Sequence, residues 1–254
     1  MVETDPIIRL RGISKSFGPL EVLRGIDLDV VDGESLVLIG GSGTGKSVLL
    51  KHLIGLLSPD EGTVEVDGHV LSELSTRELT RFRRRFGMSF QEGALFDSMT
   101  VGENVAFPLH RLSDLSKPEI RHRVRECLDA VQLPEGVEGK MPAELSGGMR
   151  RRVGFARAVA LEPRILLFDE PTTGLDPVTT AVIDQVIVEL TTRLDSTSVT
   201  ITHDMTSAFR IADRIGMLHG GEIIALAPPE EFRELDDPRV QQFLRGEAEG
   251  PLSD

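Results

Sequence analysis

The segment SLVLIGGSGTGKSVLLKHLIGLL constrains the fold of this chain more than any other part of it. Its centre, Gly40 to Ser47, matches the phosphate-binding pattern G-x-x-x-x-G-K-[ST]. The apolar run before it, Ser35 to Gly40, predicts a buried strand, and the apolar spacing after Lys46 predicts a helix. Because this motif requires a strand before it and a helix after it, the segment predicts an α/β fold with a mostly parallel sheet.

Each residue type in this loop has a chemical reason to be there. Glycines let several backbone N–H groups converge on phosphate oxygens, and the start of the following helix adds the positive end of a dipole. Lys46 is expected to reach the β- and γ-phosphates, and the Ser47 hydroxyl is expected to bind Mg²⁺. The predicted nucleotide-binding residues are Gly40, Gly41, Ser42, Gly43, Thr44, Gly45, Lys46, Ser47 and Val48.

A second buried strand, RILLFDE (Arg164 to Glu170), ends in two acidic residues. Asp169 can hold Mg²⁺ through its water shell, and Glu170 can orient or deprotonate an attacking water. Such an acidic pair is often only a solvated loop. Its occurrence together with a phosphate loop favours the metal and base roles.

The remaining segments alternate between strand-like and helix-like patterns. SVTITHD (Ser198 to Asp204) predicts a third buried strand, VTTAVIDQVIVELTTRL a crossover helix, and RIGMLHGGEIIALA two short strands around a Gly-Gly turn. Near the N-terminus, IIRLRGISKSFG, IDLDVVDGE and GTVEVDG alternate and are punctuated by turns, which predicts an antiparallel layer. We therefore expect residues 1–92 and 161–235 to form the core, 93–160 an inserted helical subdomain, and 236–254 a tail that contains a short helix.

The stretch ELSGGMRRR has the features of a second anion-binding site. Ser146 is a good N-cap residue, and the amides of Gly147 and Gly148 lie at the start of the predicted helix GMRRRVGFARAVAL. An ordinary serine-capped helix start is the alternative. The basic runs Arg81–Arg85 and Arg150–Arg152 are expected to lie on solvated helix faces, with contact to lipid head groups or an acidic partner as the second interpretation.

Composition excludes several classes of protein. The net charge of −13 disfavours a nucleic-acid binder, which usually carries a basic surface. No stretch approaches the about 20 apolar residues of a membrane span, and the start MVETDPIIRLRG lacks the apolar region of a secretory signal. The single cysteine, Cys127, is expected to be a small apolar residue on a helix rather than part of a disulfide.

Taken in order, GGSGTGKS, Gln91, LSGGM, ILLFDEP, TGLD and THD resemble the motifs of the nucleotide-binding subunit of ABC transporters, from about Ile7 to Phe243. The resemblance implies a P-loop NTPase (RecA-like) core with an N-terminal antiparallel β layer and an inserted α-helical subdomain. It also implies ATP and Mg²⁺ as cofactors, ATPase activity, and a head-to-tail homodimer. Each ATP would then lie between the phosphate loop of one subunit and the signature loop (Ser146, Gly147, Gly148) of the other.

The resemblance implies further roles, residue by residue. Phe17 matches the aromatic residue that stacks on adenine, with a plain core position as the alternative. Gln91 matches the loop glutamine that contacts Mg²⁺ and the attacking water. Asp176 in TGLD matches the loop that crosses the dimer interface, and His203 matches the switch histidine near the γ-phosphate. The implied catalytic residues are Glu170, His203, Gln91 and Lys46, and the implied Mg²⁺ ligands are Ser47, Gln91 and Asp169.

Three local features are similar to the ATPases of the lipid-asymmetry (Mla), mammalian-cell-entry (Mce) and toluene-tolerance systems. These features are FQEGALFDSMTVGENVAFPL, LSGGMRRR and DPRVQQFLRGEAEGP. The similarity implies an ATPase at the cytoplasmic face of a bacterial inner membrane that serves the transport of phospholipids or related hydrophobic molecules across or between envelope membranes. The implied partners are a permease dimer, a lipid-binding MCE-domain protein and a STAS-domain subunit, with no nucleic acid. The residues offered for permease contact, with helical-subdomain core as an equal alternative, are Ala94, Leu95, Phe96, Met99 and Val101.

Two rival classes fit the sequence less well. A soluble ABC ATPase of translation or DNA repair usually has two cassettes or a coiled-coil insertion, and this chain shows one cassette and no heptad run. A regulatory, non-catalytic subunit would be expected to lack Lys46, Glu170 or His203, and all three are present. An ABC ATPase for a different substrate remains the main alternative.

Overall fold

The computed structural model describes residues 5–91 and 93–252 and divides the chain into two compact units. Unit 1 consists of residues 1–75 and 201–254, and unit 2 of residues 76–200. Residues 1–4, which open the segment expected to lack a secretory signal, and the last two residues of the predicted tail lie outside the described residues.

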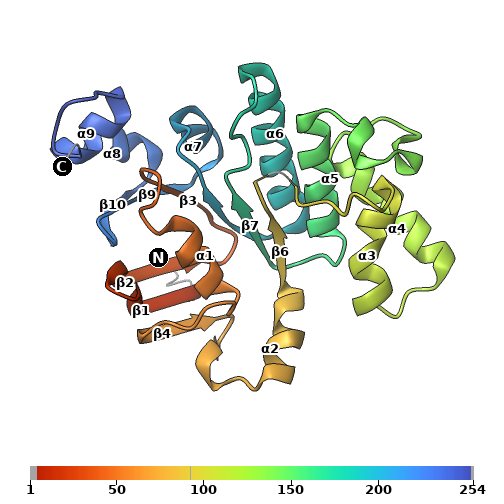
Figure 1. Cartoon of the computed structure of the whole chain (residues 1–254), viewed down its shortest axis with the longest axis horizontal. Coiled ribbons are helices and arrows are strands. Elements are labelled where there is room, and N and C mark those ends of the chain that lie inside the picture. The colour runs from red at the N-terminus through yellow and green to blue at the C-terminus, as the bar shows by residue number, and fades with distance from the viewer. Residues whose placement is uncertain (1–4, 92, 253–254) are drawn as a thin grey trace. The chain divides into compact units, whose positions relative to one another are not determined.

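Unit 1 contains the predicted antiparallel layer, drawn in red and orange in Figure 1. Its strand order is β2-β1-β4-β5. Buried residues alternate with more exposed ones over residues 8–11 of β1 and 26–31 of β2, as expected of a layer with one covered face. Leu10 fixes the register, because it pairs with Leu28 on one side and Val64 on the other. The strands are β1 (Pro6–Phe17), β2 (Leu20–Val31), β4 (Glu61–Val66) and β5 (His69–Val70).

The same unit holds the strand that leads into the phosphate loop. β3 (Ser35–Ile39) is buried along almost its whole length and pairs in parallel with β9 (Arg214–His219), which pairs antiparallel with β10 (Glu222–Ala227). This arrangement confirms the predicted buried strand and the predicted pair of strands around Gly220-Gly221. The helices of this unit are α1 (Lys46–Leu53), η1 (Leu71–Glu73), α7 (Met205–Ile211), α8 (Pro229–Arg233) and α9 (Pro238–Arg245).

Helix α1 ends earlier than the apolar pattern after Lys46 suggests. Gly55 has a φ of +62°, and the amides of Gly55 and Leu56 donate to the carbonyls of His52 and Lys51 at 3.0 and 2.8 Å. These are the bonds of a glycine-terminated helix end, which satisfies the last carbonyls and stops the helix. The short helix predicted near the C-terminus is confirmed as α9, which Asp237 caps by accepting from the Arg239 amide at 2.8 Å.

In unit 2, buried parallel strands are joined by helices, as the sequence predicts. β6 pairs in parallel with β7, and β8 is the next strand along. The predicted crossover helix is confirmed as α6, which begins at Pro177 with Asp176 as its cap. The elements are α2 (Thr76–Phe82), η2 (Arg83–Arg85), β6 (Phe86–Ser89), β7 (Ile165–Asp169), α6 (Pro177–Leu194) and β8 (Thr197–Ile201).

The segment from residue 93 to residue 160 is helical, as expected. α3 and α4 both begin with a capping box, built by Thr100 with Glu103 and by Ser116 with Glu119. Phe155 of α5 packs edge-on against Phe168 of β7, with 5.1 Å between ring centroids, so this helix is anchored to the strands of its own unit. The elements are α3 (Val101–Leu112), α4 (Lys117–Ala130), η3 (Val137–Gly139), η4 (Pro142–Glu144) and α5 (Gly147–Val159).

Cys127 lies buried on α4, as expected of a small apolar residue. Burial, the largest cause, raises the pKa of its thiol to about 11. The thiol is therefore neutral and poorly nucleophilic near neutral pH.

Candidate functional site

The phosphate loop has the glycine geometry that its motif requires. Gly40 follows β3 with a φ of +152°, and a Cβ there would lie 2.3 Å from the Leu218 carbonyl oxygen. Gly45 precedes α1 in the left-handed region with a φ of +100°, and a Cβ there would lie 2.9 Å from Leu23. Side chains at these two positions would force the loop away from the neighbouring strands, which is why glycine is required.

Lys46 is buried and folds back across the loop that precedes it. Its Nζ donates to the carbonyl oxygens of Gly40 and Gly41 at 2.8 and 2.7 Å. The Thr44 hydroxyl also donates to the Gly41 carbonyl, at 3.0 Å. A single ammonium group at the start of α1 therefore lies over the glycine-rich turn, where the helix dipole also favours an anion.

Two further predicted residues belong to the same unit. Phe17 is the last residue of β1 and is 47% exposed, so the alternative that it is a core residue is excluded. Lys15 places its Nζ 5.8 Å from the centroid of this ring. His203 lies exposed between β8 and α7, directly before Asp204, which caps α7 by accepting from the amides of Thr206 and Ser207 at 2.8 and 3.2 Å.

In unit 2, the two predicted acids lie at the end of a buried strand. Asp169 is the last residue of β7 and is half-buried. Glu170 has a φ of +51°, a left-handed conformation that costs a non-glycine residue about 1–3 kcal/mol. The Thr173 hydroxyl donates to its Oε2 at 2.7 Å, which fixes the direction of the carboxylate. Backbone strain of this kind clusters at functional positions.

The signature loop is confirmed as a serine-capped helix start. The Ser146 Oγ accepts from the Met149 amide at 3.2 Å and so caps α5. Gly147 and Gly148 are the first two residues of this helix. A Cβ on Gly148 would lie 2.6 Å from Cγ2 of Thr179, so the start of α5 packs directly against the start of α6. The signature loop and the loop before α6 therefore form one surface.

Asp176, predicted to cross a dimer interface, also caps α6. Its Oδ1 accepts from the amides of Val178 and Thr179 at 3.0 Å each, and its Oδ2 accepts from the Thr179 hydroxyl at 2.5 Å. The hydroxyl contact is the largest of the causes that lower the pKa of this carboxyl group. The aspartate thus has a structural role within its own chain in addition to its predicted one.

The loop that follows Gln91 is held by two arginines of α5. Arg151 Nε donates to the Gln91 carbonyl at 2.8 Å. Arg157 donates to the carbonyls of Gly93 and Ala94 at 2.7 and 2.9 Å, where the backbone takes positive φ values of +78° and +45°. A Cβ on Gly154 would lie 2.8 Å from the Gly93 Cα, so loop and helix also touch directly.

Arg151 also reaches the turn that follows β7, because its Nη2 donates to the Thr173 carbonyl. The signature helix is therefore bonded both to Gln91 and to the residue that orients Glu170. The expectation that Arg150–Arg152 form a solvated helix face is wrong for Arg151, which is only 7% exposed. The two neighbouring arginines bind other parts of the chain: Arg150 donates to the Leu145 carbonyl and Arg152 to the Gln132 carbonyl.

The residues offered for permease contact differ in exposure. Val101 is fully buried, so it is a core residue of the helical subdomain. Ala94 is exposed and Phe96 is 42% exposed, whereas Leu95 and Met99 are partly buried. Phe96 also packs against Phe107 with the two rings tilted and their centroids 4.8 Å apart, and Cζ of Arg157 lies 5.6 Å from the centroid of the Phe96 ring.

Comparison with known proteins decides the family. Residues 23–173 match the family model described as ABC transporter. The chain belongs to the ABC transporter family. A chain of this family binds ATP with Mg²⁺ and hydrolyses it, and the cassette described above carries the motifs for both.

Three individual similarities support the same assignment. The cassette is 45% identical to the "Probable ribonucleotide transport ATP-binding protein mkl" of Mycobacterium leprae, over 96% of this chain and 70% of that protein. It is 39% identical to the "Intermembrane phospholipid transport system ATP-binding protein MlaF" of Escherichia coli K12, over 97% of this chain and 91% of that protein. Among solved structures, a dimeric ATP-binding cassette in a post-hydrolysis state with ADP and Pi gives a TM-score of 0.80 at 34% identity, covering 87% of this chain and 98% of that one.

The donor groups of this cassette fit Mg²⁺. The candidate ligands, the Ser47 hydroxyl, the Gln91 amide and the Asp169 carboxylate, are all hard oxygen donors. The described residues contain no group of three or more His, Cys, Asp or Glu side chains that could enclose a metal by themselves. A site with one carboxylate suits Mg²⁺, which is usually held jointly by a few protein oxygens and nucleotide phosphates. Among residues 5–91 and 93–252, no helix is long and apolar enough to cross a bilayer.

Proposed function

We propose that this ABC cassette is the ATPase subunit of a bacterial system that moves phospholipids or related hydrophobic molecules between envelope membranes. The observation that carries the proposal is the nearly end-to-end similarity to MlaF, which spans 97% of this chain and 91% of that protein. In this proposal the chain acts at the cytoplasmic face of the inner membrane, on a separate permease dimer. An MCE-domain lipid-binding protein and a STAS-domain subunit complete the assembly.

Within one subunit, the nucleotide is held by the phosphate loop and by Phe17, which stacks on the adenine. Lys46 neutralises charge on the β- and γ-phosphates, and Ser47, Asp169 and Gln91 would hold Mg²⁺, which would supply further positive charge to the nucleotide. The side chain of Lys46 already lies over the loop, which supports this role.

Glu170 accepts a proton from the attacking water, and Gln91 and His203 position that water and the γ-phosphate. The hydroxyl of Thr173 aims the Glu170 carboxylate, and a preset direction avoids the cost of orienting it during the reaction. Catalysis in this proposal rests on positioning and charge neutralisation rather than on covalent chemistry.

The second subunit supplies the other half of each site. Ser146, Gly147 and Gly148 contact the γ-phosphate held by the partner, through the serine hydroxyl and the first amides of α5. Asp176 lies at the same surface, because α5 and α6 start side by side. This geometry supports a head-to-tail homodimer in which ATP draws the two subunits together and hydrolysis releases them.

The contact with the permease is proposed at the loop after Gln91. Ala94 and Phe96 are exposed there, and the loop is fastened to α5 by Arg157. A permease helix that presses on these residues would therefore act on the signature helix, which contacts the nucleotide of the partner subunit.

The test is reconstitution of the ATPase with its permease in liposomes that contain a fluorescent phospholipid. ATP should drive exchange of the labelled lipid, and Glu170→Gln should bind ATP yet stop both hydrolysis and exchange. Lipid exchange without dependence on ATP, or near-normal turnover by Glu170→Gln, would contradict the proposal.

A second candidate substrate follows from the 45% identity to a protein named for ribonucleotide transport. The same liposomes, loaded with or exposed to a radiolabelled ribonucleotide, distinguish the two. ATP-driven movement of the ribonucleotide, with no movement of the labelled lipid, would replace the phospholipid assignment.

A further inference from the structure

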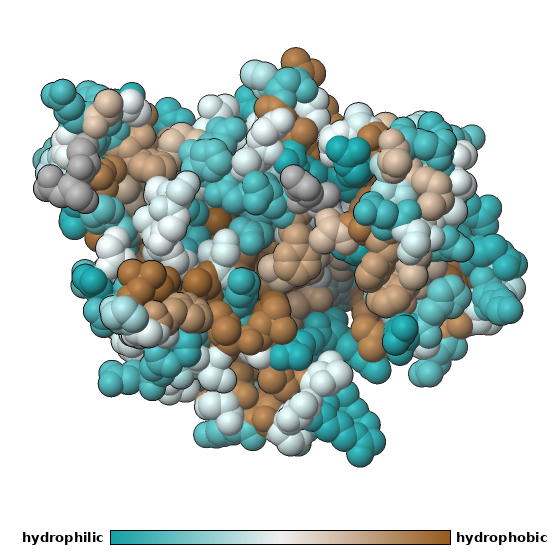
Figure 2. Space-filling model, in the orientation of Figure 1, coloured by the Kyte–Doolittle hydropathy of each residue, from teal (hydrophilic) through white to brown (hydrophobic). Residues whose placement is uncertain are grey.

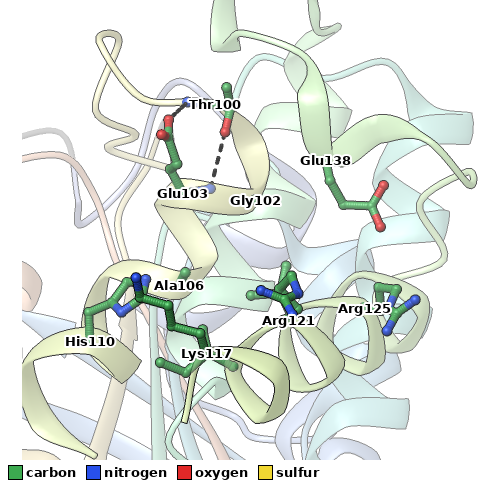
Figure 3. A pocket seen from close by; sticks show the side chains of 11 residues that line it. Thr100, Gly102, Glu103, Ala106, His110, Lys117, Arg121, Arg125 and Glu138 are labelled. Atoms are coloured by element: carbon green, nitrogen blue, oxygen red, sulfur yellow. Dashed lines mark hydrogen bonds between the residues drawn. The ribbon is translucent and has the colours of Figure 1, made fainter. Parts of the chain in front are cut away.

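A cavity of about 640 Å³ lies between α3, α4 and η3 in unit 2 (Figure 3). Its lining begins at Thr100 and Glu103, where the Thr100 amide donates to the Glu103 carboxylate at 2.8 Å. These residues directly follow the loop at which the permease contact is proposed, so the cavity belongs to that contact. A different feature, in unit 1, has no role in the function described so far.

This feature is the carboxylate of Asp60, which lies between α1 and β4 and binds the end of β1 with both of its oxygens. Its Oδ1 accepts from the Lys15 Nζ at 2.6 Å, and its Oδ2 accepts from the Ser16 amide at 2.7 Å. The amide of Asp60 also donates to the Ser14 carbonyl at 2.9 Å. The bond from Lys15 is the largest of the causes that lower the pKa of Asp60, so the carboxylate is charged near neutral pH. One residue therefore holds the three residues that precede Phe17.

The end of β1 depends on such support because its strand pairing is irregular. The register of β1 against β2 shifts twice between Ile13 and Ser16, and its register against β4 shifts between Arg11 and Ser14. Bulges of this kind interrupt the ladder of hydrogen bonds and change the direction of nearby side chains. The direction of Phe17 is therefore set in part by contacts from outside the ladder.

Lys15 links the carboxylate to the ring of Phe17. Its Nζ lies 5.8 Å from the ring centroid while it is bound to Asp60. The Lys15 side chain is 17% exposed and Phe17 is 47% exposed, so the ring stays open to a ligand while the lysine beside it is largely covered. Figure 2 shows hydrophobic residues gathered over β1, β2 and α1, a surface suited to the flat face of a base.

Asp60 is also tied closely to the helix of the phosphate loop. The Leu57 amide donates to the Lys51 carbonyl of α1 at 3.1 Å, and Pro59, whose ring fixes its φ, directly precedes Asp60. The segment from α1 to Asp60 is therefore compact, and α1 begins with the lysine of the phosphate loop. Through Asp60, the ring of Phe17 and the phosphate loop are held at a fixed separation.

Two other ion pairs of the same layer lack this connection. Glu65 of β4 accepts from Arg9 at 2.9 Å, and Asp29 of β2 pairs with Arg11 at 2.8 Å. Each of these pairs joins two strands of the antiparallel layer. Asp60 instead joins a strand of the layer to the segment that leaves α1.

We propose that Asp60 is a positioning residue for the base of the bound nucleotide. It sets the direction of Phe17 relative to the phosphate loop, so that one nucleotide can place its base on the ring and its phosphates on the loop without rearrangement. Such preorganisation raises affinity, because the ring does not have to be ordered when the nucleotide binds. The inference rests on the stacking role of Phe17 in the proposed function and adds a residue outside the nucleotide motifs.

The experiment measures binding of ADP and of inorganic pyrophosphate, each with Mg²⁺, to the full chain by isothermal titration calorimetry. ADP carries the base, whereas pyrophosphate carries the phosphates alone. The variant is Asp60→Ala, and the matched control is Glu65→Ala, which removes the carboxylate paired with Arg9 near the start of β1. The chain contains no Trp or Tyr, so Phe17→Trp adds a single indole whose fluorescence reports stacking in each background.

We expect Asp60→Ala to raise the Kd for ADP about tenfold and to leave the Kd for pyrophosphate within about twofold. Glu65→Ala should change neither value by more than about twofold. In the Phe17→Trp background, Asp60→Ala should reduce the quenching of the indole by saturating ADP, because the ring is no longer held in the stacking direction. Equal weakening of ADP and pyrophosphate, unchanged ADP binding, or an equal loss in the control would overturn the inference.

Phe17→Ala separates this inference from the proposed function. If it weakens ADP binding and Asp60→Ala does not, the stacking role stands and the role of Asp60 fails. If it binds ADP as the parent does, the proposed adenine contact fails as well. Lys15→Met should weaken ADP binding less than Asp60→Ala, because the bond from the Ser16 amide remains. A larger loss in Lys15→Met would assign the effect to the lysine and overturn the role of Asp60.

Discussion

Replacement of Arg151 by methionine should slow ATP hydrolysis without weakening ATP binding. Methionine has a similar length and apolar character but donates no hydrogen bond. The change removes one bond to the Gln91 carbonyl and one to the Thr173 carbonyl. Gln91, which positions the attacking water in the proposed mechanism, and Glu170, which accepts its proton, would then each lose a support while remaining present.

The size of the effect follows from these contacts. Hydrogen bonds from a charged donor contribute about 1.5–3 kcal/mol each, so the two bonds restrain the loops by about 3–6 kcal/mol. Part of this is recovered when water or neighbouring groups take the place of the guanidinium. A displacement of about 1 Å at reacting groups typically costs about 100-fold in rate. We therefore expect kcat to fall about 100-fold, which corresponds to about 2.7 kcal/mol of the activation barrier.

The assay is steady-state ATPase activity of the reconstituted complex over a range of ATP concentrations, with nucleotide affinity measured separately by a fluorescent ATP analogue. The matched control is Arg152→Met, which removes a neighbouring arginine of the same helix that donates to the Gln132 carbonyl, away from both loops. KM and analogue affinity should stay within about twofold for Arg151→Met, since the phosphate loop is untouched. Thermal unfolding of both variants reports any general loss of stability.

Three results would refute this reasoning. Equal losses of kcat in Arg151→Met and Arg152→Met would show that the arginine only supports the helix. A raised KM with unchanged kcat would place it in nucleotide binding. Unchanged kinetics would show that the Gln91 and Thr173 carbonyls need no such support. A second variant, Thr173→Val, removes only the hydroxyl that orients Glu170 and should also lower kcat at constant KM.

Three further outcomes follow from other features of the site and core. Ser146→Arg should abolish turnover by filling the anion seat, whereas Met149→Gln should be tolerated, because the contacts of the signature loop come from the serine and the glycine amides; equal losses in an ATPase assay would contradict this division. Gly40→Ala should reduce ATP binding and lower the melting temperature, since its Cβ would meet the Leu218 carbonyl at 2.3 Å, and unchanged binding by isothermal calorimetry would be inconsistent with that contact. Cys127 should resist a thiol reagent at pH 8 and react fully in urea. Its pKa of about 11 in the folded protein lies above the ordinary value of 9.0, so the thiol ionises first in the unfolded chain. The free energy of unfolding should therefore fall as the pH rises from 9 towards 11, which urea titration can measure.

Local patterns predicted the framework of this cassette well. The strand before Gly40, the helix after Lys46 and the serine cap before α5 each depend on residues that are close in sequence, and each is confirmed. The antiparallel layer follows in the same way from the alternating stretches within β1 and β2.

Two features of the site could not be read from the sequence, because tertiary packing decides them. Successive residues on a helix point about 100° apart, so Arg150, Arg151 and Arg152 leave α5 in three directions. Which of them becomes buried depends on the loop at Gln91, 60 residues away, and no periodicity encodes that contact. The positive φ of Glu170 is likewise set by the strand and turn around it. Arg151 lies on the apolar side of α5, and an arginine at such a position is the sequence signal that could have predicted its burial.

The hold of α5 on the glutamine loop uses main-chain carbonyls of Gln91, Gly93 and Ala94 as acceptors. Every amino acid supplies the same carbonyl, so an exchange at the exposed Ala94 that keeps the local backbone leaves the acceptors intact, whereas a Cβ on Gly93 would lie 2.7 Å from the Arg150 carbonyl oxygen. The donors have no such redundancy, because only arginine offers a planar fork of several N–H groups. In a saturation library selected for transport, the arginine donors of α5 should therefore tolerate fewer substitutions than the loop residues whose carbonyls they bind. Arg151 and Arg157 should accept almost no replacement, while Ala94 should vary widely.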